Sequence, residues 1–478
     1  MQPSQGRFFL YPAQRLLIHF KKYIRFGWLG FAYSRLTCKA VNFGSEMDNP
    51  STIFVWGLVF MNNVNPVVGV DVAKDFCYYC VLSPDGKKYL EPFKAFNTKE
   101  GLDFVLEKLK KVEKAFKNRP VIVLESTGHY SARLVHLFGK NEFEVFLVNP
   151  LQSHSIKNSS IRKVKNDKAD AEELARLYFV CDLQQHRPFD DSIANLKVLS
   201  RAYFSLSEQR ISMLNQLTAA VDQVLPGFTR IFNISSKTCV ELLARYSSPD
   251  ALLSSPKEDV ASLIRSCSRR SLKYALDKYQ LLIQCAKDAK ETGITLSALY
   301  DVICIYAQNL KYLNDKLTEL DEMIQRLAIT IPEVSLISSI PGFGKRLSSV
   351  IVSEVGDISR FNNAKQLVAY CGIDPSVKQS GNFVGTKNKF TKRGSAYIRK
   401  ALYIAATISV RKDSKARCVN PVIYDYYQKK IKSKPKKQAL GAVMNKLVRI
   451  IFSVLKNKHP FVMITPEEQI KLYRSKAA

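Results

Sequence analysis

Apolar and polar residues alternate along the chain with two periods, and the change from one period to the other predicts the elements. Between residues 67 and about 190, short runs of β-branched and aromatic residues alternate with stretches in which apolar residues recur every three or four positions. The short runs predict strands, and the longer period predicts amphipathic helices. We predict strands at residues 67–72, 76–82, 89–96, 121–124 and 145–148, and helices at 98–116, 131–139 and 166–178.

The order of these elements predicts the fold of the first domain. Three consecutive strands are followed by a helix, a strand, a helix and a strand, which is the order of a ribonuclease-H-like α/β fold. We assign residues 66–190 to this domain. Residues 191–331 have few strand signals and predict a helical linker, and residues 332–478, rich in glycine turns and lysine, predict a third, mainly helical domain.

The second half of the linker carries the most regular hydrophobic pattern in the chain. Apolar residues spaced alternately by three and four form a heptad seam, which is typical of a coiled coil. The seam residues are Leu296, Leu299, Ile303, Tyr306, Leu310, Leu313, Leu317, Leu320, Ile324, Leu327 and Ile331. This seam can pack within the chain or between subunits, and the pattern slightly favours pairing between subunits.

The first part of the chain shows no such pattern. Aromatic, basic and apolar residues mix from Arg7 to Trp56 without a sustained period of a strand or a helix. Met61 stands just before the first predicted strand. We therefore interpret residues 1–65 as an N-terminal extension and Met61 as the native start, with a genuine basic arm as the alternative.

The charge of the chain indicates what kind of partner it binds. The 478-residue chain has 72 basic and 42 acidic residues, which gives a formal net charge of +30. Such an excess attracts polyanions, and nucleic acid is the usual one, with a membrane surface as the alternative. Near the front, the uncharged apolar run at residues 52–61 is too short to span a bilayer. We expect a cytoplasmic protein without a membrane partner.

The cysteines indicate a reducing compartment. Ten cysteines in a chain of this length are too sparse for a disulfide framework. Cys77 and Cys80 have CxxC spacing, but they fall in an alternating strand pattern, and no second cysteine or histidine pair lies at zinc-finger distance. We interpret both as thiols of the core.

Four carboxylates stand where predicted elements could bring them together. Asp71 and Glu125 end strands, and Asp167 and Asp170 lie three residues apart on one helix face. Carboxylate oxygens are suitable ligands for Mg²⁺, and a pair of such ions can stabilise both oxygens of a phosphoryl transfer. Each residue alone is more simply a cap or a turn, but on this strand order the four together favour a two-metal site.

Two glycine-containing segments of the last domain could contact phosphate. In the first, Gly342, Gly344 and Lys345 resemble the turn of a helix-hairpin-helix, although glycine also serves as a plain helix cap. In the second, Ser380 precedes a glycine in a basic loop. The basic residues of that loop are Lys387, Lys389, Lys392 and Arg393. From the residues alone, Ser380 is more simply a turn former than a nucleophile.

Five motifs in register resemble a known family. The chain is similar to the DEDD transposases of the IS110 and IS1111 insertion sequences, which are related to the Piv/MooV DNA invertases. The match runs from Met61 to about Ile408. The motifs are VVGVDVAK at residues 67–74, VLESTG at 123–128, KNDKADA at 165–171, IPGFG at 340–344 and QSG at 379–381.

The resemblance implies roles for these residues. It implies a RuvC-like first domain, a coiled-coil linker and a transposase domain. Asp71, Glu125, Asp167 and Asp170 would form the metal-binding tetrad, and Ser380 would be the covalent nucleophile. It also implies a homo-oligomer, dimer or tetramer, that recombines donor and target DNA under the guidance of a noncoding bridge RNA. The alternatives are a site-specific invertase, a junction-resolving nuclease and an inactive remnant that binds nucleic acid. The long front and the lysine-rich run at residues 429–437 depart from the family pattern.

Overall fold

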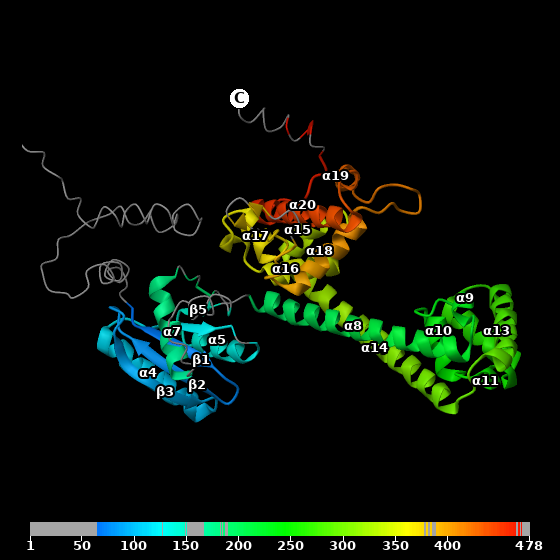
Figure 1. Ribbon diagram of the computed structural model, residues 1–478, viewed down its shortest axis with the longest axis horizontal. Coiled ribbons are helices and arrows are strands. Elements are labelled where there is room, and N and C mark those ends of the chain that lie inside the picture. The colour runs from blue at the N-terminus through cyan, green and yellow to red at the C-terminus, as the bar shows by residue number, and fades with distance from the viewer. Residues whose placement is uncertain are drawn as a thin grey trace, which may run out of the picture. The chain divides into compact units, whose positions relative to one another are not determined.

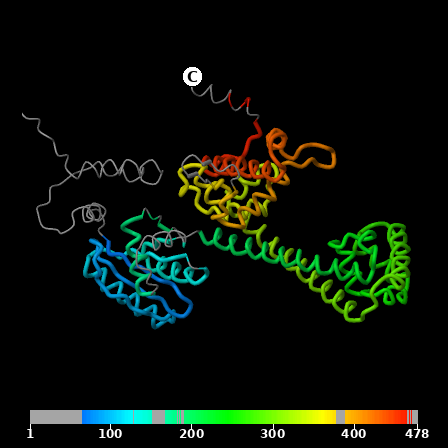
Figure 2. The backbone as a smooth tube through the Cα atoms, in the orientation of Figure 1, coloured from blue at the N-terminus to red at the C-terminus, as the bar shows by residue number. Residues whose placement is uncertain are grey.

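The computed structural model gives two compact units, residues 1–188 and 189–478, which we describe separately (Figures 1 and 2). The described residues are 65–126, 128–148, 150, 167–181, 183, 185–186, 190–376, 379–380, 383–384, 389–464, 467–468 and 470. The expected N-terminal extension, residues 1–65, and the predicted native start at Met61 lie outside the described residues except for Asn65.

The first unit is built on a mixed five-stranded sheet of order β3-β2-β1-β4-β5. Its strands are β1 (Val67–Val72), β2 (Phe76–Leu82), β3 (Lys88–Phe96), β4 (Val121–Glu125) and β5 (Val145–Val148). The first three strands are antiparallel, and β4 and β5 run parallel to β1. The predicted α/β region is therefore confirmed, with strand bounds that differ by at most one residue.

Helices cover both faces of this sheet. The first helices, α4 (Lys99–Phe116) and α5 (Tyr130–Lys140), pack their apolar stripes on one face, where Val68, Val70 and Tyr79 are fully buried. The third helix, α7 (Asp167–Val180), packs on the other face over Cys80 and Val123. Because strand side chains alternate between faces, the two cores are separated by the sheet itself.

The second unit is mostly helical. Its helices are α8 (Asp191–Val224), α9 (Phe228–Ile231), α10 (Lys237–Arg245), α11 (Pro249–Ser254), α12 (Lys257–Ser268), α13 (Leu272–Thr292), α14 (Ser297–Thr330), α15 (Pro332–Ser338), α16 (Lys345–Val355), α17 (Ala364–Tyr370), α18 (Ala396–Ser409), α19 (Pro421–Ile431) and α20 (Lys436–Asn457). A short 3₁₀ helix (Ile358–Arg360) and a small hairpin, β6 (Gln379–Ser380) and β7 (Phe383–Val384), complete it.

Two hydrophobic cores share the long helices α8 and α14. One core joins the end of α8 and the start of α14 to α9–α13. The other joins the start of α8 and the end of α14 to α15–α20. The heptad seam packs within the chain, because α14 lies along α8 and buries Ile303, Leu310 and Ile324 there. Pairing of the seam between subunits stays a prediction.

One described helix, α20, is long and apolar enough to cross a membrane by length and composition. Its apolar residues also form part of the second core, where Val443, Leu447 and Ile451 are almost completely buried. A core helix passes the same test of length and hydropathy, so this helix is explained by its packing.

Candidate active site

The sheet of the first unit places two carboxylates side by side. Asp71 lies near the end of β1, and Glu125 is the last residue of β4. The parallel register pairs Val70 with Leu124, so the next pair is Asp71 and Glu125. Because side chains alternate along a strand, Asp71 and Glu125 point to the same face as Val67, Gly69 and Val123, which is the face covered by α7. Both carboxylates are half-buried. Neighbouring strands lie about 4.8 Å apart, so the two acids share one edge of the sheet.

Helix α7, which carries the other two predicted carboxylates, packs closely on this face of the sheet. Asp167 and Asp170 lie in the first turn of α7, and Asp170 directly precedes Ala171. The Ala171 carbonyl oxygen lies only 1.9 Å from where a Cβ of Gly69 would stand, so this approach requires glycine. Gly69 is two residues before Asp71. Asp170 is half-buried and Asp167 is exposed.

Carboxylate oxygens are the kind of ligand that a hard divalent cation prefers. Within the described ranges, however, no group of three or more His, Cys, Asp or Glu residues is arranged to hold a metal ion. Residues 151–166, which lead into α7, fall outside the described residues. The structure thus sets Asp71 and Glu125 on neighbouring strands, with Asp170 in the first turn of the helix packed on the same face, and the tetrad as a metal centre stays a prediction.

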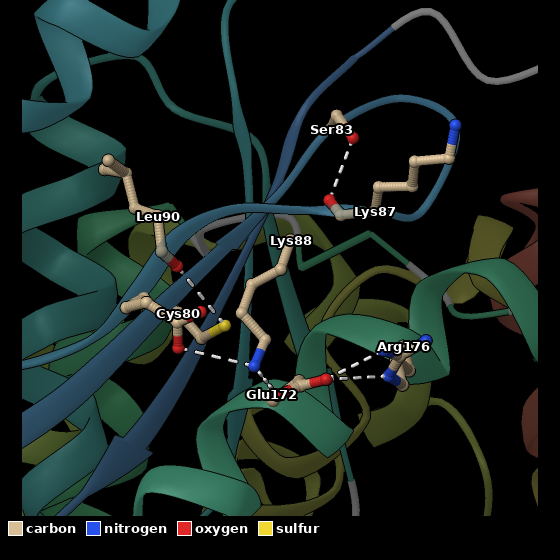
Figure 3. A network of polar contacts seen from close by, with 8 residues as sticks. Cys80, Ser83, Lys87, Lys88, Leu90, Glu172 and Arg176 are labelled. Atoms are coloured by element: carbon tan, nitrogen blue, oxygen red, sulfur yellow. Dashed lines mark hydrogen bonds and ion pairs between the residues drawn. The ribbon is translucent and has the colours of Figure 1, made fainter.

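An ionic cluster fixes α7 on the sheet (Figure 3). The Glu172 carboxylate on α7 forms ion pairs with Lys88 Nζ of β3 at 3.0 Å and with Arg176 Nη2 at 2.7 Å. Although burial would raise the pKa of Glu172, its hydrogen bonds with Arg176 and Lys88 bring it below its ordinary value. These contacts anchor the helix two residues after Asp170.

The two cysteines of the CxxC spacing are free thiols in β2. Cys77 lies in the core under α4, and Cys80 lies in the core under α7, so they stand on opposite faces of the sheet. Burial raises the pKa of Cys80 to about 12. The two thiols cannot share a zinc ion, which supports their interpretation as core residues.

In the second unit, the segment that we predict as the turn of a helix-hairpin-helix joins α15 to α16. Gly342 has φ +103°, and a Cβ there would lie 2.3 Å from Ser409 Oγ, so this glycine allows packing on α18. Gly344 caps α16, and a Cβ there would meet nothing within 4 Å. Gly344 and Lys345 are exposed at the helix start, as a phosphate contact requires, whereas Gly342 has a packing role.

The serine motif lies in the small hairpin. Ser380 is in β6 and pairs with Phe383 of β7. Lys387 lies outside the described residues. The segment that returns from the hairpin exposes three basic residues, Lys389, Lys392 and Arg393. The structure therefore places the serine and three of the four predicted basic residues on one loop.

The two ends of this loop are tied together at its base. Pro375 forms a β-bridge with Phe390, and the backbone N–H of Lys392 donates to the carbonyl of Gly372 at 3.1 Å. A Cβ on Gly394 would lie 1.8 Å from the Tyr370 carbonyl oxygen, so the returning chain lies directly against α17. These contacts hold the two ends of the Ser380 loop close together and against the end of α17.

A buried carboxylate that the motifs did not single out supports this base. Glu354 on α16 is 1% exposed, and its side chain accepts from Arg201 of α8 and from Ser395, which caps α18 directly after the basic segment. Its backbone carbonyl accepts from the Tyr370 hydroxyl at 2.8 Å. The sequence signal was one acid within an apolar helical run, which did not reveal its partners.

Comparisons with known proteins match both units. A family model of the DEDD group of IS110, described as "Transposase", matches residues 68–226, and a model described as "Transposase IS116/IS110/IS902 family" matches residues 334–428. The matched regions contain all the carboxylates discussed above and the serine hairpin.

Individual relatives agree with these models. The chain is 32% identical over 162 residues to a "Pilin gene-inverting protein" of Moraxella bovis, a match that covers 32% of this chain and 47% of the relative. It thus spans about half the length of that relative and of its Moraxella lacunata counterpart. An uncharacterized 43.6 kDa protein of insertion element IS110 from Streptomyces coelicolor is 22% identical over 83% of this chain and 95% of its own length.

The two family models lie in the same order and on the same structural elements as the motifs recognised in the sequence. One spans the five-stranded sheet and α8, and the other spans α16, the serine hairpin and α18. The chain belongs to the IS116/IS110/IS902 family of insertion-sequence transposases.

Proposed function

We propose that this protein is a DNA transposase that cuts and rejoins the strands of an insertion element and its target in the cytoplasm. The observation that carries the proposal is the match of two transposase models to the carboxylate-bearing unit and to the serine-bearing unit of one chain. The formal net charge of +30 fits a nucleic-acid substrate.

Ser380 is the proposed nucleophile. Its hydroxyl oxygen forms an ester bond to the phosphorus of a DNA strand while the bond from phosphorus to one deoxyribose oxygen breaks, and that oxygen takes the proton. The ester conserves the energy of the broken bond, so religation needs no further reactant. The basic side chains on the same loop, Lys389, Lys392 and Arg393, would hold the backbone phosphates.

The carboxylates Asp71, Glu125, Asp167 and Asp170 are the proposed ligands of Mg²⁺ in a ribonuclease-H-like, RuvC-like unit. When bound, the cation would stabilise negative charge on the phosphate oxygens. The support is the register of β1 and β4, which sets two of the acids side by side, and the contact of α7 with Gly69.

Guidance by a bridge RNA and assembly as a dimer or tetramer follow from the family resemblance and are part of the proposal. A site-specific invertase is the second candidate, because a pilin gene-inverting protein is among the relatives. The two activities share one chemistry and differ in how the DNA sites are arranged.

A search for the covalent adduct tests the proposal. Wild-type protein incubated with Mg²⁺ and a nicked DNA substrate should give a band on a denaturing gel that carries both DNA and protein and that protease removes. Ser380→Ala should lose this band and still bind the DNA. A wild-type protein that cuts the strand efficiently without any such band would instead be a metal-dependent nuclease.

A further inference from the structure

An aromatic row lies beside the carboxylates on the same face of the sheet. We define the aromatic row as the rings of Phe76, Tyr78 and Phe96 together with the side chain of Lys94, which lies over two of these rings. The register sets Asp71 opposite Tyr78, Tyr78 opposite Lys94, and Phe76 opposite Phe96. Directly opposite residues of antiparallel strands point to the same face. The row therefore continues the line of Asp71 across β2 and β3, on the α7 side.

The rings of the row are in mutual contact and remain accessible. Phe76 lies edge-on to Tyr78 and to Phe96, with ring centres 5.9 and 6.3 Å apart. Phe96 is 55% exposed, and Phe76 and Tyr78 are half-buried. Large exposed apolar side chains that cluster on one face usually mark a binding surface.

A cation is built into this surface. The Nζ atom of Lys94 lies 3.7 Å from the ring centre of Phe76 and 5.0 Å from that of Phe96, while its side chain is exposed. The row thus offers flat π faces and a positive charge within one side-chain length. Nucleotides present the complementary pair of groups, a flat base and a phosphate.

The backbone next to the row is held in place. Asn97 directly follows Phe96, and its side-chain amide donates to the carbonyls of Ala73 and Lys74 in the β1–β2 turn at 3.0 and 2.9 Å. Its backbone N–H donates to the Asp75 carbonyl at 2.9 Å. The turn between Asp71 and Phe76 is therefore tied to the end of β3, so the acid and the rings keep their spacing.

We propose that the aromatic row stacks unpaired nucleobases of the DNA strand next to the phosphate delivered to Asp71. A duplex turns its base edges outward and hides its base faces, so the row selects a strand whose bases are unpaired. Lys94 would contact a phosphate of the same strand. This inference deepens the proposed function and rests on it for the identity of the strand as DNA.

The test compares single-stranded and duplex DNA of the same sequence. Full-length protein carrying Phe96→Leu, Phe76→Leu or both is titrated into fluorescently labelled oligonucleotides in EDTA, where no metal-dependent step proceeds. The leucines keep the apolar volume and remove the π face. We expect the double variant to bind the single strand about tenfold more weakly, while duplex affinity stays within about twofold. Lys94→Gln should lower the slope of log affinity against log salt by about one.

A matched control exists on the other face of the sheet. Phe104 is 45% exposed, packs edge-on to Phe93 and has Lys108 Nζ 4.9 Å from its ring centre. Phe104→Leu changes the same residue type in the same kind of cluster away from Asp71. It should leave both affinities unchanged.

Four outcomes would overturn the inference. The first two are an unchanged affinity of the double variant for single-stranded DNA and an equal loss of affinity for duplex DNA. The third is a loss of affinity for single-stranded RNA with none for single-stranded DNA. The fourth is a change of oligomeric state on sedimentation, which would assign the surface to a second copy of this chain. Failure of the proposed function is seen separately, because the adduct test depends on Ser380 and Mg²⁺ and the titrations depend on neither.

Discussion

Arg201 and Glu354 form a bidentate ion pair across 153 residues of sequence, with Nε–Oε1 at 2.6 Å and Nη2–Oε2 at 3.1 Å. The carboxylate is 2% exposed and the guanidinium 44%. The pair joins α8, the first helix of the second unit, to α16, which Gly344 caps. Through Ser395, which donates to the same carboxylate at 2.8 Å, it also reaches the end of the basic segment.

Removing the arginine should cost more than neutralising the acid. Arg201→Met leaves a buried carboxylate without its main partner, and we expect the free energy of unfolding to fall by about 3 kcal/mol. Glu354→Gln leaves a half-exposed guanidinium that water can solvate, and the loss should be about 1 kcal/mol. Urea unfolding followed by circular dichroism measures both.

Arg417→Met is the control for this pair. Arg417 pairs with Asp413 at 2.8 Å but is 73% exposed, so its loss should change stability by less than about 1 kcal/mol. Equal effects of the changes at positions 201 and 417 would show that the buried pair contributes no more than a surface one.

The same carboxylate makes stability depend on pH. Burial alone would raise the pKa of Glu354, but the hydrogen bond from Arg201 and the charge of Lys197 bring it below its ordinary 4.5. Because the pKa is lower in the folded state, the ionised group stabilises the fold above pH 4.5 and this contribution disappears as the pH falls through the folded pKa. The stability gap between wild type and Glu354→Gln should therefore be widest at neutral pH and shrink in acid. A gap of the same size at both would contradict the assignment.

Gly69→Ala should disturb the carboxylate edge. The added methyl would lie 1.9 Å from the Ala171 carbonyl oxygen and 2.6 Å from the Ala175 amide nitrogen, both backbone atoms of α7, so the helix has to move. We expect a loss of about 2–3 kcal/mol in unfolding free energy and slower strand cleavage. Gly139→Ala, in α5, meets nothing within 4 Å and should be neutral or stabilise by up to about 1 kcal/mol. Thermal unfolding that ranks the two variants in the opposite order would refute this packing.

Asp71→Asn should abolish strand cleavage in Mg²⁺ and leave DNA binding within about twofold, since one charge among many contributes little to affinity for DNA. Asp85→Asn, in the exposed turn between β2 and β3, is the matched control and should cleave at the wild-type rate. The comparison is read from single-turnover cleavage and from a gel-shift titration of the same preparations. Cleavage by Asp71→Asn at the wild-type rate would show that the tetrad is misassigned.

Local patterns predicted the sheet well because each strand is a β-branched run bounded by turn residues. Val67–Val72 and Phe76–Leu82 are buried by the same rule that identified them. The packing partner of an apolar stripe could not be predicted in the same way, because the seam of α14 indicates only that some apolar surface must cover it. Its partner α8 was identified only in three dimensions.

The candidate site shows the same division. Asp71 and Glu125 could be predicted at one edge because parallel strand ends meet there, and the register agrees. Glu354 could not be assigned, because its partners Arg201 and Ser395 come from distant segments. The aromatic row was equally hidden, because it depends on which residues of β2 and β3 stand opposite each other.

Helices α8 and α14 contain neither glycine nor proline, and each contributes side chains to both cores of the second unit. Kinks arise mainly at such residues, so the pair has no built-in hinge along its length. At 1.5 Å per residue, each helix is about 50 Å long. A displacement or rotation at the α9–α13 end is therefore expected to reach the core formed with α15–α20. That core includes α17 and α18, the helices before and after the serine hairpin in the chain.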